Sequence, residues 1–67
     1  MRTIIKALRQ ERGISQAELA EQVGVSRQTI ISIENGRYVA SLPLAYRIAH
    51  YFGKTIEDVF DLADEEA

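Results

Sequence analysis

Apolar residues recur every three or four positions along most of this 67-residue chain, which is the spacing that places them on one face of an α-helix. Five such runs occur, and the segments between them are short. Each of these segments contains a glycine or a hydroxyl side chain of the kind that ends or begins helices. The pattern therefore predicts an all-α domain built from five short helices.

The central residues, 16–36, predict two helices that meet at a tight turn. Ser15 is followed three residues later by Glu18, which is the spacing of a capping box at a helix start. Gly24 can adopt the left-handed conformation that ends this helix. Ser26 then caps a second helix, which extends to residue 34. A connection this short, about three or four residues, is typical of a helix-turn-helix.

Three further helices flank this pair. The first spans residues 3–12 and ends at Gly13, the fourth follows Ser41 and ends at Gly53, and the fifth follows Thr55. Their apolar faces consist of Ile4, Ile5, Leu8, Ala45, Ile48, Ala49, Phe52, Ile56, Val59 and Phe60.

Length and composition limit what the chain can be. Residues 1–67 are expected to form a single domain, with its core between about residues 4 and 62 and an acidic tail at 63–67. The chain has no cysteine, so neither a disulfide nor a thiolate–metal site can reinforce its small core. No segment approaches the roughly 18 consecutive apolar residues of a membrane span, and none resembles a signal peptide. We expect a cytoplasmic protein.

The net charge of the chain is −2, but its charges are unevenly distributed. Residues 1–54 contain all eight Lys and Arg and four of the ten Asp and Glu, which gives +4. Residues 55–67 contain the other six acidic residues, which gives −6. Such a chain can direct a basic face towards phosphates while its acidic end points away. The acidic end can equally be a solvated terminus.

The second helix of the central pair carries polar residues that core packing does not require. Arg27, Gln28 and Thr29 open this helix, and Ser32 lies one turn further on. Arginine can pair with guanine, glutamine with adenine, and hydroxyl groups with several bases. We interpret residues 26–34 as a recognition helix that contacts DNA bases. The alternative is a helical domain whose outer faces are simply polar.

The chain resembles the helix-turn-helix family of Cro and the phage repressors. The similarity extends from about residue 4 to residue 62 and is closest to the small stand-alone repressors, among them the cytolysin-operon repressor. Within the central pair, it is carried by Gln16, Leu19, Ala20, Gly24, Val25, Ser26, Ile30, Ile33, Glu34, Asn35 and Gly36. Beyond it, the matching residues include Tyr38, Ser41, Leu42, Leu44, Ala45, Ile48, Ala49, Glu57 and Asp58.

The resemblance also implies roles for individual residues. A carboxylate at the C-terminal end of a helix is disfavoured by the helix dipole and requires a partner. Glu34 stands at such a place, and the family pairs this position with an arginine of the first helix, here Arg9. By the same resemblance, the residues that contact the DNA backbone are Gln16, Ser26, Asn35 and Arg37. Ile31 stands where relatives usually carry a polar residue, and its role stays open.

The small repressors of this family pair through their C-terminal region, which implies a homodimer. The expected interface consists of Tyr51, Ile56, Val59, Phe60 and Leu62. A short β pairing between residues 1–3 and 60–62 is expected beside it. The alternative is that these apolar residues only close the core of the single chain.

The sequence therefore predicts a sequence-specific regulator of transcription, a repressor that binds a palindromic operator in double-stranded DNA as a dimer. There is no cysteine nucleophile, and the single histidine, His50, has no evident catalytic partner. The four glycines are dispersed as helix stops instead of forming a phosphate-binding loop. We expect no enzymatic activity, metal site, cofactor or small-molecule ligand. The alternative function is a protein-interaction module of the antitoxin or co-activator type.

Overall fold

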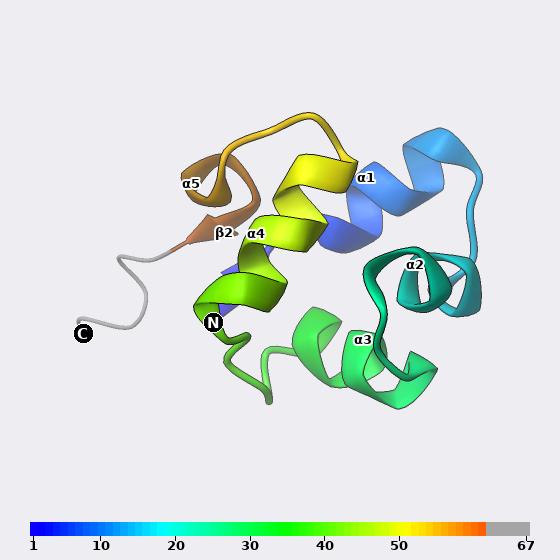
Figure 1. Cartoon of the computed structure of the whole chain (residues 1–67), viewed down its shortest axis with the longest axis horizontal. Helices are drawn as coiled ribbons and strands as arrows, with labels where there is room; N and C mark the ends of the chain where they lie inside the picture. The colour runs from blue at the N-terminus through cyan, green and yellow to red at the C-terminus, as the bar shows by residue number, and fades with distance from the viewer. Residues whose placement is uncertain (62–67) are drawn as a thin grey trace.

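The computed structural model describes residues 1–61, and Figure 1 shows their arrangement. The elements in chain order are β1 (Arg2–Thr3), α1 (Ile5–Arg12), α2 (Gln16–Val23), α3 (Arg27–Glu34), α4 (Leu42–Tyr51), α5 (Ile56–Val59) and β2 (Phe60–Asp61). The predicted all-α class with five short helices is confirmed. Within residues 1–61, no helix is long and apolar enough to cross a membrane. The acidic tail at 63–67 lies outside the described residues.

The two ends of the described chain are joined by a small antiparallel sheet. Arg2 lies opposite Asp61, and Thr3 lies opposite Phe60. This confirms the predicted terminal pairing for the residues that the structure describes. Because the pairing forms within one chain, it closes the helical domain at its two ends.

Helix α1 begins later than the sequence pattern predicts. Residues 2–3 belong to β1, so the predicted start at residue 3 is wrong, and the helix begins at Ile5. The Thr3 hydroxyl accepts a hydrogen bond from the Ile5 N–H at 3.3 Å. Ile4, expected on the apolar face of the helix, is 46% exposed because it lies at the junction of strand and helix.

Capping boxes set the starts of α2 and α5, and the box at α2 is the predicted one. The Ser15 hydroxyl accepts from the Glu18 N–H at 3.0 Å, and the Glu18 carboxylate accepts from the Ser15 N–H at 3.0 Å. Thr55 and Asp58 make the same reciprocal pair at 3.2 Å in both directions. Hydrogen bonds from the backbone and the side chain of Thr55 lower the pKa of Asp58 below its usual value. These local bonds satisfy N–H groups that the first turn of a helix leaves unpaired.

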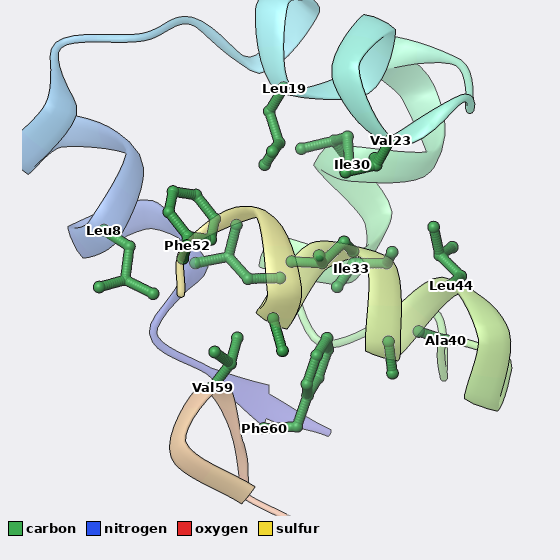
Figure 2. Packing of buried hydrophobic residues seen from close by; sticks show 14 of the residues in the cluster. Leu8, Leu19, Val23, Ile30, Ile33, Ala40, Leu44, Phe52, Val59 and Phe60 are labelled. Atoms are coloured by element: carbon green, nitrogen blue, oxygen red, sulfur yellow. The ribbon is translucent and has the colours of Figure 1, made fainter. Parts of the chain in front are cut away.

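Apolar side chains from all five helices meet in one core (Figure 2). Val59 and Phe60 are each only 1% exposed, and Figure 2 shows both directed towards α4. Both side chains are therefore already covered by other residues of the same chain, so they are not available for the expected dimer interface. Tyr51 and Ile56 are only partly buried, and Leu62 lies outside the described residues.

Candidate nucleic-acid interface

Helices α2 and α3 form the helix-turn-helix, and their connection is fixed by backbone geometry. Gly24 ends α2 with φ of 78°, a left-handed conformation that favours glycine because a side chain there is strained. The Val25 N–H donates to the Ala20 carbonyl at 3.0 Å, which turns the chain towards α3. The apolar side chains that hold the two helices together in the core are Leu19, Ala20, Val23, Ile30 and Ile33.

Ser26 caps α3, and this capping engages two of the predicted DNA-contact residues. The Ser26 hydroxyl accepts from the Thr29 N–H at 3.2 Å, and the two hydroxyl oxygens lie 3.0 Å apart. A phosphate oxygen can only accept, so it can use the Ser26 O–H when the Thr29 hydroxyl donates to Ser26. The Thr29 side chain is half-buried, and its contact with Ser26 helps to fix the start of the helix.

The predicted base-contact residues of α3 lie in its first two turns. Arg27 and Gln28 are exposed, whereas Thr29 and Ser32 are half-buried. Gln28 and Ser32 are four residues apart and share one face, and Arg27 shares a neighbouring face with Ile31. The structure therefore places the four predicted base-contact residues on the same part of the helix, with Arg27 and Gln28 the most accessible. Ile31 is half-buried at the edge of this face.

The loop after α3 carries the other predicted backbone contacts. Asn35 and Arg37 are exposed, and Gly36 between them has φ of 75°. The Ser32 carbonyl accepts from the Arg37 N–H at 3.0 Å, so the loop is tied back onto the helix. Within residues 1–61, the guanidinium groups of Arg27 and Arg37 form no hydrogen bond or ion pair. Both cations are therefore available to an external anion such as a phosphate.

A polar network beneath this surface joins the first three helices. The Arg9 Nε donates to Glu34 Oε2 at 2.8 Å, and Arg9 Nη2 donates to Glu34 Oε1 at 3.2 Å. The ion pair that the resemblance implies is thus present in the structure. The Arg9 and Glu34 side chains are only 12% and 5% exposed. The hydrogen bond to Glu34 is the main cause that raises the pKa of Arg9. Burial opposes this rise, and the attraction of the Glu34 charge adds a smaller one.

The sequence did not reveal a third member of this network. The Gln16 Nε2 donates to Glu34 Oε1 at 3.2 Å, so this predicted DNA-contact residue also has a partner within the protein. The Arg9 Nη1 donates to the Ile14 carbonyl at 3.1 Å. Gln16 and Glu34 are 18 residues apart in the chain, so no local pattern could have paired them.

Exposed apolar side chains form a further feature that the sequence analysis did not single out. Leu42 and Tyr46 are 71% and 56% exposed, and their spacing of four residues places them on the outer face of α4. Tyr38 and Val39 in the preceding loop are also exposed. Helical spacing places Leu42 and Tyr46 beside the buried Ala45 and Ala49 of the same helix, so the sequence pattern alone could not separate the exposed residues from the buried ones.

Comparison with known proteins agrees with this architecture. A family model described as helix-turn-helix matches residues 5–59. An uncharacterized HTH-type transcriptional regulator from Methanothermobacter thermautotrophicus is 56% identical, and the match covers 100% of this chain and 99% of the relative. The HTH-type transcriptional regulator YgzD of Bacillus subtilis is 49% identical over 97% of this chain and 98% of its own.

Two solved structures share the fold. The clp gene regulator ClgR from Corynebacterium glutamicum superposes with a TM-score of 0.76 at 29% identity, covering 92% of this chain and 66% of that chain. A chain of the complex between the SinR and SinI proteins gives 0.77 at 28% identity, covering 94% and 62%. This chain spans about two thirds of those solved chains. With a family match over most of its length, the chain belongs to the Cro- and C1-type helix-turn-helix family of DNA-binding transcriptional regulators.

Proposed function

We propose that this protein is a cytoplasmic repressor of transcription that binds a palindromic operator with α3 in the major groove. The proposal rests on the side chains in the first turn of α3. Arg27 and Gln28 are exposed there and have no partner within residues 1–61, while Ile30 and Ile33 anchor the opposite side of the helix in the core. A rigid helix that offers an unpaired arginine and glutamine suits the reading of base edges.

The flanking residues then set the position of α3 on the duplex. Arg37 and Asn35 in the following loop contact one stretch of phosphates, and Gln16 and Ser26 at the starts of α2 and α3 contact another. Such contacts fix register and supply most of the salt-dependent affinity without reading sequence. Bound across a promoter, the protein excludes RNA polymerase and so represses transcription.

Selection of bound duplexes from a random pool, followed by measurement of Arg27→Ala, tests the function. On the selected sequence, Arg27→Ala should weaken binding by about 1–3 kcal/mol and relax preference at one base pair. Lys6→Ala, which removes one charge from the exposed side of α1, is the matched control and should keep the preference. If Arg27→Ala weakens binding equally on selected and scrambled duplexes, then Arg27 contacts only a phosphate.

The operator is bound by a homodimer. One unit of this size buries only about 600–1,000 Å² on DNA, whereas a two-fold dimer reads two half-sites about 34 Å apart. The surface we assign to the partner copy must leave α3 free. It consists of Tyr51 and Ile56, the two residues of the original expectation that are only partly buried.

Light scattering behind a sizing column measures this association. The wild type should elute with the mass of a dimer, and Ile56→Glu should shift it to the monomer without loss of helical circular dichroism. Gln10→Glu on the exposed side of α1 adds the same charge and should stay dimeric. A monomeric wild type at micromolar concentration that also binds DNA as a monomer contradicts the dimer.

A protein-interaction module is the second candidate. It is favoured by the exposed apolar side chains of Tyr38 and Tyr46, and by the similar solved chain that comes from a complex of SinR with the protein SinI. Retention on a column of mixed-sequence duplex DNA separates the two functions. A DNA-binding protein is retained and released by salt, whereas an interaction module elutes at low salt.

A further inference from the structure

We propose that Glu34, held in place by Arg9, is a positioning residue that orients the side-chain amide of Gln16 for contact with a DNA phosphate. The proposal rests on the proposed function, because it concerns how one backbone contact is prepared. It assigns the Arg9–Glu34 pair a role in DNA binding in addition to its role in packing.

The hydrogen bonds of Glu34 determine which end of the Gln16 amide faces it. An ionised carboxylate can accept hydrogen bonds but cannot donate them. Glu34 therefore selects the Nε2 of Gln16 over the carbonyl Oε1, and the observed bond from Nε2 to Glu34 Oε1 is 3.2 Å. The carboxylate itself cannot rotate away, because Arg9 holds both of its oxygens, at 2.8 and 3.2 Å. The Arg9 Nη1 is fixed in turn by the Ile14 carbonyl.

This arrangement leaves one donor of Gln16 available. The side-chain nitrogen carries two N–H groups that diverge, and one of them is used by Glu34. No residue among 1–61 accepts the second. A phosphate oxygen is an acceptor, so it can use this N–H but not the Gln16 Oε1. Gln16 is also the first residue of α2, where the helix dipole favours a nearby anion.

Arg9 removes the electrostatic obstacle to this arrangement. A carboxylate close to a phosphate-binding group would repel the DNA if its charge were unbalanced. The bidentate pair with Arg9 balances the charge of Glu34, and the Glu34 side chain is only 5% exposed. Without Glu34, the terminal torsion of Gln16 has no fixed value, and the amide can present either end to the DNA. The network thus supplies an oriented donor without adding a net charge.

The test is a double-mutant comparison of affinity for a mixed-sequence duplex, because a backbone contact does not depend on sequence. Gln16→Ala should weaken binding by the wild type about tenfold, the loss of one hydrogen bond to a charged group. In the Glu34→Ala background, which removes the acceptor of the Gln16 amide, the same change should weaken binding less than about threefold. Arg37→Ala is the matched control and should give the same factor in both backgrounds, because Arg37 lies outside the network.

The possible outcomes separate the two proposals. An equal loss for Gln16→Ala in both backgrounds overturns the positioning role and leaves the proposed function intact. No salt-dependent binding of the duplex by the wild type overturns the proposed function and this inference with it. Circular dichroism at the temperature of the assay ensures that folded proteins are compared.

A second measurement uses the wild type alone, in case Glu34→Ala does not fold. The two side-chain amide protons of Gln16 can be followed by ¹⁵N–¹H NMR as the duplex is added. The proton bonded to Glu34 should keep its chemical shift, and the other should move downfield as it meets a phosphate. If the amide leaves Glu34 on binding, so that the first proton loses its shift, the positioning role is refuted.

Discussion

The strongest prediction for stability concerns the Arg9–Glu34 pair. Removing Arg9 and removing Glu34 should lower the free energy of unfolding by different amounts. Arg9→Ala leaves the Glu34 carboxylate, which is 5% exposed, with only the Gln16 amide as a partner. Glu34→Ala leaves a guanidinium that is 12% exposed and still donates to the Ile14 carbonyl. Since an unpaired buried charge is more destabilising than a partly hydrated one, we expect Arg9→Ala to have the larger effect.

The expected magnitude follows from the burial of the pair. Breaking a buried ion pair by removing one partner lowers the free energy of unfolding by about 3–5 kcal/mol. A domain of this length is stable by only about 3–10 kcal/mol. We therefore expect about 3–4 kcal/mol for Arg9→Ala and about 2–3 kcal/mol for Glu34→Ala, whose remaining cation reaches water. At about 4–8 °C per kcal/mol, Arg9→Ala should lower Tm by at least about 12 °C.

Urea unfolding followed by circular dichroism measures these values. The double variant should lose less than the sum of the single losses, by at least about 1 kcal/mol, since the two residues share one interaction. Additive losses would refute this account of the pair.

Two further predictions concern a DNA contact and a helix cap. Arg37→Ala should weaken binding to all duplexes about evenly and reduce the slope of log affinity against log salt by about one, measured by fluorescence anisotropy; an unchanged slope places that side chain off the DNA. Asp58 has a lowered pKa in the folded protein, so its contribution to stability is present above the usual value of about 3.9 and is lost as pH falls through the folded pKa. Asp58→Asn should therefore flatten the acid limb of the stability profile in urea titrations, and an unchanged limb contradicts the capping role.

Local chemistry explains why most of the fold could be predicted from the sequence. A helix start depends on residues within one turn, so the reciprocal pairs of Ser15 with Glu18 and Thr55 with Asp58 follow from spacing alone. A helix end at Gly24 follows from the conformational freedom of glycine. These signals require no knowledge of tertiary structure, and their positions agree with the helices that the structure shows.

Contacts between distant parts of the chain explain what the sequence could not predict. The sequence pattern predicts one helix over residues 3–12. In the structure, Thr3 belongs to the β1–β2 pairing that joins the two ends of the described chain, so α1 begins at Ile5. From the sequence, Val59 and Phe60 could belong to the core or to an interface. Only the packing of α5 against α4 and the burial of both side chains in the core decide between these. The bond from Gln16 to Glu34 likewise depends on how α2 and α3 pack. Apolar spacing identifies a face of an element but does not identify what covers that face.

The net negative charge of the chain does not oppose DNA binding at the start of α3, because charges act over a limited distance in salt. The described acids of the C-terminal segment, Glu57, Asp58 and Asp61, belong to α5 and β2. Figure 1 shows these elements and the start of α3 towards opposite ends of the longest axis, along which the molecule measures 32 Å. The Debye length at physiological ionic strength is about 8 Å, so charges several such lengths apart are largely screened from each other. The potential at Arg27 is therefore set by its neighbours, and an acidic chain can still present an electropositive helix start to DNA.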